Sequence, residues 1–352
     1  MNKQKLSAID AKFEAQKIAF APLTFQAIRA MKNLGVMENI RSSQGQATKE
    51  SIMADLDLDD YTVEILLDTA EVMNVIEVED GRIQLSKIGY FLLRDELTRV
   101  NMNFSHDVCY NGSAFLEDSL KQGKPSGLKV FGSWPTVYEA LAHLEDDVRK
   151  SWLEFDHFYS QDAFDSALKI VFEKKPKTLF DIGGNTGKWS FKCCDYDENV
   201  KIKILDLPGQ IEMAKANVLK KGLEHRIEFH PMNILDPEHA IPKGADIIWM
   251  SQFLDCFSKE QIIDILSKCK EAADADTSIF IMEPFIDNQP YEAASYSLAA
   301  TSLYFSCIAN GNSKMYKLPQ FESMIDQAGL KIINTHLLME DNFHTIIECK
   351  KA

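Results

Sequence analysis

Residues 180–190 read FDIGGNTGKWS, and this stretch decides which class of fold the chain is expected to adopt. It begins within TLFDI, a short apolar run typical of a buried strand, and a helix is expected to begin at Lys188. Between strand and helix lie Gly183, Gly184, Asn185 and Gly187. Glycine is needed where a chain turns sharply or a ligand approaches the backbone, and asparagine also tolerates the left-handed conformation. The stretch therefore predicts a strand–turn–helix unit with a ligand at the turn.

The turn departs from two common phosphate-binding patterns. In a P-loop a Ser or Thr follows the lysine, but Trp189 follows Lys188, and Ile182 stands where the first glycine belongs. The spacing is not GxGxxG either, which disfavours a dinucleotide. A glycine-rich turn can also serve packing alone, and that reading stays open here.

Two acidic residues favour a nucleoside ligand. Asp206 ends the next apolar run, KIKILDLP, about 25 residues after Asp181, where an acid can accept hydrogen bonds from both ribose hydroxyls. As an alternative, Asp206 could cap the helix that follows. Asp181 could face a positively charged ligand or brace the amides of the loop. An acid before the glycines and a second acid for the ribose together suit a cationic nucleoside such as S-adenosylmethionine.

The chain downstream of this unit alternates between strands and helices. Short apolar runs (TLFDI, KIKILDL, RIEFH, ADIIWM and TSIFIMEP) are separated by helix-like segments, which predicts an α/β, doubly wound, mostly parallel sheet. KIINTHLLM and NFHTIIECK are joined by a turn-like MED, so the last strand is expected to be antiparallel. We expect three parts: a helical winged-helix domain (1–100), a helical linker contributing to the acceptor pocket (101–172) and a ligand-binding domain (173–352).

The first part ends in a predicted hairpin. In VIEVEDGRIQL, Ile76 and Val78 alternate with polar residues, as do Ile83 and Leu85, around an Asp-Gly turn. Helices followed by such a wing indicate a winged-helix module. The helix before the wing carries six acidic residues and no Lys or Arg between them, so phosphate repulsion argues against DNA binding. Protein–protein contact is the expected use, and FAPLTFQAIRAMKNLGVM, apolar on several sides, fits burial against a partner subunit.

Composition narrows the class of protein further. The net charge of −15 opposes broad contact with nucleic acid, and the seven cysteines lack CxxC spacing, so neither a zinc site nor a disulfide framework is expected. The first 20 residues contain no continuous apolar core for a signal peptide, and no run reaches the ~18 residues of a membrane span. We expect a cytoplasmic protein with no metal, nucleic acid or membrane partner.

These motifs together resemble those of a known family. FDIGGNTGKWS resembles the DxGGGxG motif of the winged-helix S-adenosylmethionine-dependent O-methyltransferases, which include caffeic acid and acetylserotonin O-methyltransferases. ILDLP resembles the ribose-binding strand end of that family, ADIIWMSQFLDCFSKEQ its LHDWSD region, and IFIMEPF the strand that carries a functional glutamate. The resemblance extends over nearly the whole chain. It implies S-adenosylmethionine as cofactor, a homodimer formed through the N-terminal domains and a small-molecule acceptor.

The resemblance also implies roles for individual residues. The loop and methionine side of the cofactor would be lined by Asp181, Gly183, Gly184, Asn185 and Gly187. Asp206 would hold the ribose and Leu207 would contact the adenine. Asn233 is expected on the adenine side, with Met232 as the competing alignment, and Tyr159 falls near a further cofactor-contacting position.

The expected chemistry differs from that of the family at the position of the catalytic base. Aligned on Phe257, the family histidine is replaced by Asp255; Met315 replaces a second family glutamate, whereas Glu283 is retained. Asp255 and Glu283 are the expected catalytic pair. An ordinary Asp has a pKa about 6 units below that of a phenol, but burial and a second acid raise it. Asp255 could instead cap the following helix, the acceptor could need no base, or one of three histidines could serve: His106, His157 or His230.

The sequence thus predicts a methyltransferase that acts on a small aromatic or polyketide-like acceptor, most often at oxygen. A protein of the same fold with a different reaction, or none, is one alternative. A ligand-responsive regulator and an NAD-dependent enzyme are two others, disfavoured by the acidic helix and by the imperfect fingerprint.

Overall fold

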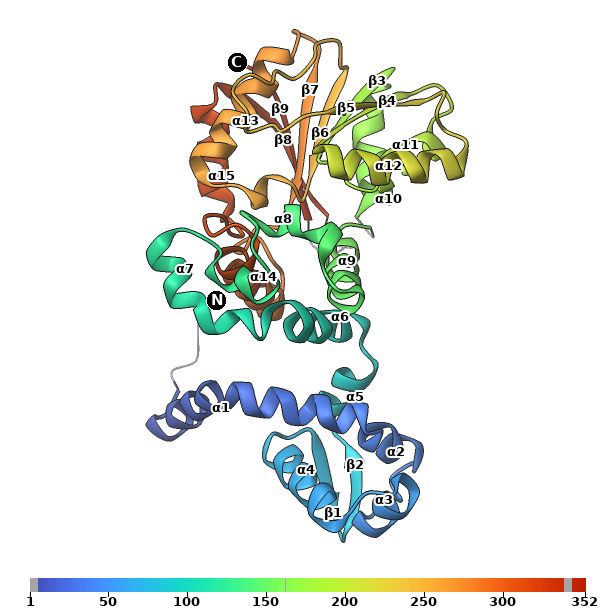
Figure 1. Cartoon of the computed structure of the whole chain (residues 1–352), viewed down its shortest axis with the longest axis vertical. Helices are drawn as coiled ribbons and strands as arrows, with labels where there is room; N and C mark the ends of the chain where they lie inside the picture. The colour runs from blue at the N-terminus through green and yellow to red at the C-terminus, as the bar shows by residue number, and fades with distance from the viewer. Residues whose placement is uncertain (1–5, 162, 339–343) are drawn as a thin grey trace. The chain divides into compact units, whose positions relative to one another are not determined.

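The computed structural model of the chain describes residues 6–161, 163–338 and 344–352 (Figure 1). The chain forms two compact units, Met1–Met102 and Asn103–Ala352. No helix among the described residues is long and apolar enough to cross a membrane.

The first unit is helical apart from one hairpin. Its elements are α1 (Ala8–Asn33), α2 (Val36–Ser42), α3 (Lys49–Leu56), α4 (Asp60–Val72), β1 (Ile76–Glu79), β2 (Arg82–Leu85), α5 (Lys87–Arg94) and α6 (Glu96–Phe104), of which the last crosses the boundary between the units. The predicted hairpin is confirmed, since Ile76 pairs with Leu85 and Val78 with Ile83. Asp80 and Gly81 both have positive φ (49° and 74°), as a two-residue turn of the right twist requires.

Helix α1 buries little of its apolar surface. Ser7 caps it by accepting the N–H of Asp10, and only Ile28 and Met31 of its residues are fully buried. Ile9 and Ile18 are 81% and 77% exposed. A helix with large apolar residues facing water along much of its length is typical of a segment that another chain covers.

The second unit begins with helices and continues as a sheet flanked by helices. The helices before the sheet are α7 (Leu116–Gln122), α8 (Val137–Ala140), α9 (Asp146–Gln161) and α10 (Phe164–Val171). The strands are β3 (Thr178–Ile182), β4 (Lys201–Asp206), β5 (Ile227–Pro231), β6 (Ile247–Ser251), β7 (Ser278–Glu283), β8 (Leu330–Leu338) and β9 (His344–Lys351). The helices between them are α11 (Lys188–Tyr196), α12 (Pro208–Lys221), α13 (Lys259–Ala272), α14 (Glu292–Tyr304) and α15 (Leu318–Gln327).

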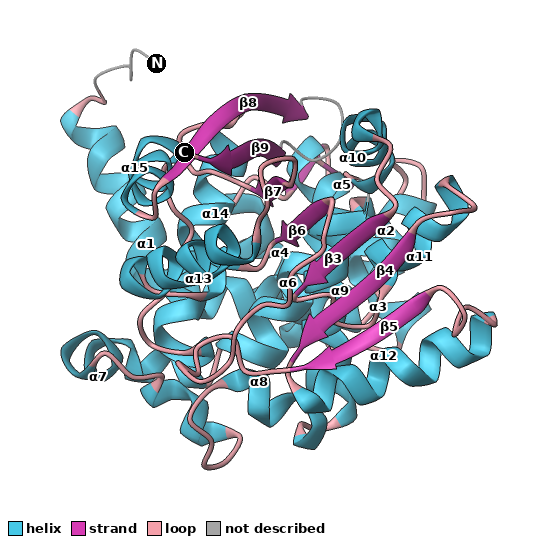
Figure 2. Ribbon diagram, turned by 90° about the horizontal axis from the view of Figure 1, so that it is seen from above, coloured by secondary structure: helices cyan, strands magenta, loops and turns pink. Residues whose placement is uncertain are grey.

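The sheet has seven strands in the order β5-β4-β3-β6-β7-β9-β8 (Figure 2). Strands β3 to β7 are parallel, and β9 lies antiparallel between β7 and β8. The predicted mostly parallel sheet with an antiparallel last strand is therefore confirmed. Both faces are covered: α10, α11 and α12 pack on one and α13 and α15 on the other. This double burial explains why the central strands read as continuous apolar runs.

The order of the strands positions the ligand site. The chain leaves β3 towards β4 and β5 and then returns to β6 on the other side of β3. Loops at the carboxyl ends of strands diverge at such a switch point, and the crevice between them is where open α/β sheets bind ligands.

Candidate active site

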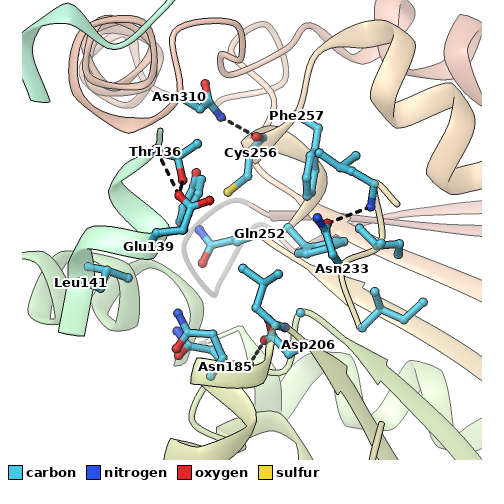
Figure 3. A pocket seen from close by; sticks show the side chains of 18 of the residues that line it. Thr136, Glu139, Leu141, Asn185, Asp206, Asn233, Gln252, Cys256, Phe257 and Asn310 are labelled. Carbon is cyan, nitrogen blue, oxygen red and sulfur yellow. Dashed lines mark hydrogen bonds between the residues drawn. The ribbon is translucent and has the colours of Figure 1, made fainter. Parts of the chain in front are cut away.

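A cavity of about 280 Å³ opens at the carboxyl ends of β3, β4 and β6 (Figure 3). Residues that follow these three strands line it, together with residues from α8 and α9. Of the predicted cofactor-binding residues, the cavity wall includes Gly183, Asn185, Asp206, Leu207 and Asn233. Sites for small molecules have volumes of roughly 300 Å³ or more, so the cavity is at the lower end of that range.

The glycine-rich turn is held in a left-handed conformation. Gly183, Asn185 and Gly187 have φ of 73°, 48° and 87°. A Cβ at Gly183 would lie 2.2 Å from the ring of Phe253, so only glycine fits there. The turn aims the backbone N–H of Asn185 at Asp206 Oδ2, 2.9 Å away. The turn therefore joins the ends of β3 and β4 at the cavity.

Asp206 presents its carboxylate to the cavity rather than to a helix. Its Oδ1 accepts the N–H of Leu207 at 2.7 Å and its Oδ2 that of Asn185. The N-cap of α12 is Leu207 without a side-chain cap, so the capping alternative is wrong. Each oxygen keeps a second lone pair, and two such acceptors suit a pair of ribose hydroxyls. Burial raises the pKa of Asp206 to about 6, against the lowering effect of the two N–H groups.

Asp181 lies beneath the loop and does not line the cavity. It is 2% exposed and accepts a hydrogen bond from Ser190 Oγ at 2.6 Å. A Cβ at Gly184 would come within 2.9 Å of the same carboxylate, so these two residues brace the turn from below. Burial raises the pKa of Asp181 to about 7.

The raised pKa of Asp181 predicts a particular pH dependence of stability. A carboxyl whose pKa is raised by folding contributes most to stability below its unfolded value near 3.9, and this contribution is lost as the pH rises towards 7. We therefore expect Asp181→Asn to flatten the fall in unfolding free energy between pH 4.5 and 7.5. Urea unfolding across this range measures it, with the exposed Asp195→Asn as the control for loss of one charge. Parallel pH curves for wild type and Asp181→Asn would contradict the expectation.

The adenine side of the predicted site contains both aligned residues. Asn233 and Met232 each line the cavity, and Asn233 is fixed by accepting the N–H of Leu235 at 3.1 Å. Phe257 also lines it, with its ring 4.9 Å from that of Phe253. Phe257 was usable as an alignment anchor in the sequence, but its place in the cavity wall was not predicted. The side chain of Tyr159 lies outside the described part of the structure.

A second, smaller cavity of about 70 Å³ adjoins the first. Both are lined by Tyr138, Trp152, Asp156, Gln252 and Cys256. The remaining wall of the smaller cavity is largely aromatic and apolar and is made by Phe155, Asp255, Pro284, Leu298, Thr301, Tyr304, Phe305 and Met315. The two cavities, called the larger and the smaller chamber below, thus share part of their walls, and the wall of the smaller one is mostly aromatic and apolar.

Asp255 belongs to the smaller chamber. It is 5% exposed, and its Oδ1 lies 3.5 Å from the thiol of Cys256. The capping alternative is wrong here too, because Ser258 caps α13 by accepting the N–H of Gln261. A buried acid that faces a chamber and caps no helix is available for chemistry.

Glu283 lines neither chamber but fixes the loop that carries Asp255. Its Oε1 accepts the backbone N–H groups of Phe253 and Leu254 at 3.0 and 2.9 Å. Burial, and then the charge of Asp255, raise the pKa of Glu283 well above its usual range. Burial also raises the pKa of Asp255, to about 7. Burial therefore makes both acids of the pair harder to ionise than an exposed carboxyl group.

Several chamber residues were missed by the sequence reasoning. Tyr138 and Asp156 come from helices ahead of the sheet, and Gln252 directly follows β6. Burial raises the pKa of Asp156 to about 6. Among the described residues, the walls of both chambers include no histidine, so His106, His157 and His230 are placed elsewhere. Within the described residues no cluster suits a metal ion.

Comparison with known proteins identifies the family. The O-methyltransferase domain model matches residues 114–331, which is more than half of the chain, and a dimerisation2-like domain model matches residues 12–83. The L-tyrosine C(3)-methyltransferase of Streptomyces lavendulae is 25% identical over 89% of this chain and 85% of that protein. Acetylserotonin O-methyltransferase of Gallus gallus is 23% identical over 75% of this chain and 78% of that protein.

Solved structures share the fold. The apo form of the S-adenosylmethionine-dependent methyltransferase SibL superposes with a TM-score of 0.72 at 21% identity, covering 95% of this chain and 98% of that one. Human N-acetylserotonin methyltransferase in complex with S-adenosylmethionine gives 0.67 at 16% identity and covers all of both chains.

The chain therefore belongs to the O-methyltransferase domain family. It is an S-adenosylmethionine-dependent methyltransferase with an N-terminal dimerisation domain, as the resemblance implied. The larger chamber fits this cofactor: Gly183 and Asn185 of the turn line it, and Asp206 offers two acceptors where a ribose is expected.

Proposed function

We propose that the protein methylates a small aromatic or polyketide-like acceptor at oxygen, with the acceptor in the smaller chamber. The observation that carries the proposal is the buried Asp255 in an aromatic wall beside the larger cavity. S-adenosylmethionine supplies an electrophilic methyl group on its sulfonium when bound. Asp206 would hold its ribose, Gly183 and Asn185 would form the loop side of its site, and Leu207 and Asn233 would contact its adenine.

The reaction requires the acceptor oxygen to lose its proton. Asp255 accepts that proton from the hydroxyl as the methyl group is transferred. Its pKa near 7 narrows the gap to a phenol from about 6 units to about 3, because burial penalises the ionised carboxylate. Glu283 acts through the loop: its two backbone hydrogen bonds fix the position of Asp255.

Methylation at carbon is the second candidate. A relative that spans 89% of this chain is named as an L-tyrosine C(3)-methyltransferase. A base that deprotonates a phenol serves this reaction as well, because the phenolate is nucleophilic at the ring carbon beside its oxygen.

Product analysis distinguishes the two candidates. The purified protein is incubated with S-adenosylmethionine carrying a trideuterated methyl group and a panel of phenols, and products are detected by mass. O-methylation removes the ultraviolet titration of the phenol near pH 10, whereas C-methylation leaves it. Failure of the protein to bind S-adenosylhomocysteine, or absence of any methylated product across a broad panel, would count against the proposal.

We also propose a homodimer formed through the first unit. The exposed apolar residues of α1, which include Ile9, Phe13 and Ile18, support this assembly, as does the dimerisation domain match. Sedimentation velocity at micromolar concentration tests it. A species of 39.9 kDa at all concentrations would contradict the proposal.

A further inference from the structure

Gln252 has an unusual backbone conformation at the junction of the two chambers. It follows β6 with φ of 46°, and its N–H donates to Met282 O at 2.9 Å. A non-glycine residue in the left-handed region is uncommon, and such residues cluster at functional sites, where the surrounding structure holds them in place. The backbone therefore fixes the direction in which the Gln252 side chain leaves the strand.

The side chain of Gln252 has an acceptor without a partner. Gln252 lines both chambers, and Figure 3 shows it projecting into the larger one. Its Oε1 is buried and receives no hydrogen bond from the described residues. Buried polar atoms are nearly always hydrogen-bonded, so this oxygen calls for a donor on a bound ligand.

The charged side chains that line the two chambers are of one sign, and Lys188, which lies outside these walls, interacts with the charge of Asp156. The described residues that line the two chambers include the carboxyl groups of Glu139, Asp156, Asp206 and Asp255, and among them is no Lys, Arg or His. Asp206 is assigned to the ribose and Asp255 to proton transfer. Glu139 and Asp156 remain, and of these two only Asp156 shares both chamber walls with Gln252. Its Oδ2 accepts a hydrogen bond from Asn185 Nδ2 at 3.3 Å and lies 4.0 Å from His157 Nε2.

We propose that Gln252 and Asp156 select acceptors that carry a protonated amine and no acid group. The inference rests on the proposed methyl transfer and names the class of acceptor for it. An ammonium group offers three N–H donors, which suits an amide oxygen and a carboxylate, and its charge offsets that of Asp156. An acid group on the acceptor would be buried beside these carboxylates, with no cation among the described residues of the chamber walls to pair with, which is unfavourable.

Binding to the protein saturated with S-adenosylhomocysteine tests the inference. The probes are tyramine, 4-ethylphenol and 3-(4-hydroxyphenyl)propionate, which share a phenol ring and carry an ammonium, no charge and a carboxylate. We expect tyramine to bind at least 10-fold more tightly than 4-ethylphenol, and the propionate to bind most weakly. Calorimetric competition at pH 7.5 gives the ratios.

Two variants connect the preference to the named residues. Gln252→Asn keeps an amide and tolerates the left-handed backbone, but its oxygen is one methylene short. Asp156→Asn keeps the shape and removes the charge. In each variant the preference for tyramine, given by the ratio of its affinity to that of 4-ethylphenol, is expected to fall at least fivefold. Both affinities are measured on the same variant, so a smaller folded fraction affects them equally and leaves the ratio unchanged. Asp147→Asn removes a charge from the same helix, α9, at an exposed residue that lines neither chamber, so it is the matched control and is expected to keep the ratio.

Each other result overturns the inference in a recognisable way. The inference is overturned if the propionate binds as tightly as tyramine or more tightly, or if tyramine does not bind measurably. In either case, binding of S-adenosylhomocysteine would leave the proposed methyltransferase reaction unaffected. If Asp156→Asn weakens the binding of S-adenosylhomocysteine but keeps the tyramine to 4-ethylphenol affinity ratio, Asp156 binds the ammonium group of the cofactor. The inference is then overturned. Loss of S-adenosylhomocysteine binding in the wild-type protein would overturn the proposed function together with it.

Discussion

Asp206→Ala is expected to weaken binding of S-adenosylhomocysteine about 100-fold or more. The variant loses the ionised acceptor that we propose holds the two ribose hydroxyls, and a hydrogen bond to a charged group contributes about 1.5–3 kcal/mol. Two such bonds correspond to roughly 100-fold or more in Kd, since each 1.4 kcal/mol is tenfold. The variant also leaves the backbone N–H of Asn185 without the acceptor that Asp206 Oδ2 provides in the wild-type protein. Isothermal titration calorimetry with wild type and variant measures the change.

The controls separate loss of the ribose contact from loss of the fold. Asp206→Asn keeps one acceptor oxygen of the same reach and is expected to bind between wild type and Asp206→Ala. Thermal unfolding without ligand reports whether the loop between β3 and α11 is still formed. Binding is also expected to weaken as the pH falls below about 6, where Asp206 takes up a proton. A Kd for Asp206→Ala within threefold of the wild-type value would contradict the proposal that Asp206 binds the ribose hydroxyls.

The sheet was predictable because its signals are local. Runs such as ADIIWM are apolar without interruption, and a strand covered by helices on both faces needs that pattern. The hairpin was predictable because Asp-Gly favours a two-residue turn. The antiparallel last strand was predictable from the short segment MED, which lies outside the described residues. Each of these features depends on neighbours within a few residues in the chain.

The site was predictable only in part, for a geometric reason. Asn185, Asp206 and Asn233 follow strands whose carboxyl ends meet at one edge of the sheet, so the topology brings them to the cavity. Which way an acid at a strand end points is set by tertiary packing. Asp181 accepts a bond from Ser190, and Glu283 turns to the amides of the loop. The sequence identified these acids but not their partners.

Residues from outside the strand–turn–helix units could not be predicted. Tyr138 and Asp156 lie on α8 and α9, and nothing local in the sequence fixes where those helices pack. Gln252 could have been found, because it follows a strand like the predicted residues. An uncharged amide, however, is a weaker indication of catalytic chemistry in a sequence than the carboxyl group of Asp255.

Asp255→Asn is expected to lower kcat by a factor of about 10² to 10⁴, the usual contribution of a general base. The asparagine keeps the size of the side chain and the loop held by Glu283, but it cannot take a proton. Binding of S-adenosylhomocysteine should change little, because Asp255 lines only the smaller chamber. Single-turnover methyl transfer to a phenolic acceptor measures the loss and separates chemistry from product release.

The pH dependence of the methyl-transfer rate tests whether Asp255 is the titrating group. The base acts when it is unprotonated, so with its pKa near 7 the wild-type rate should fall tenfold per pH unit below about 7 and level off above it. An Asp with an ordinary pKa would place that limb near pH 4. In Asp255→Asn the limb near 7 should disappear along with most of the rate. A wild-type rate that is constant from pH 5 to 9 would contradict this role.

Glu283→Gln is the matched test of positioning. The carboxamide oxygen can still accept the N–H groups of Phe253 and Leu254, so the loop should stay in place and the loss of rate should be far smaller than in Asp255→Asn. Glu283→Ala removes that acceptor and leaves two buried N–H groups unpaired, which costs about 1–3 kcal/mol each. Glu283→Ala should therefore lower both stability and rate, whereas Asp255→Asn should lower the rate without lowering stability, because it removes a buried carboxyl group whose pKa burial raises. If Glu283→Gln were as slow as Asp255→Asn, with stability unchanged, Glu283 itself would take part in the proton transfer.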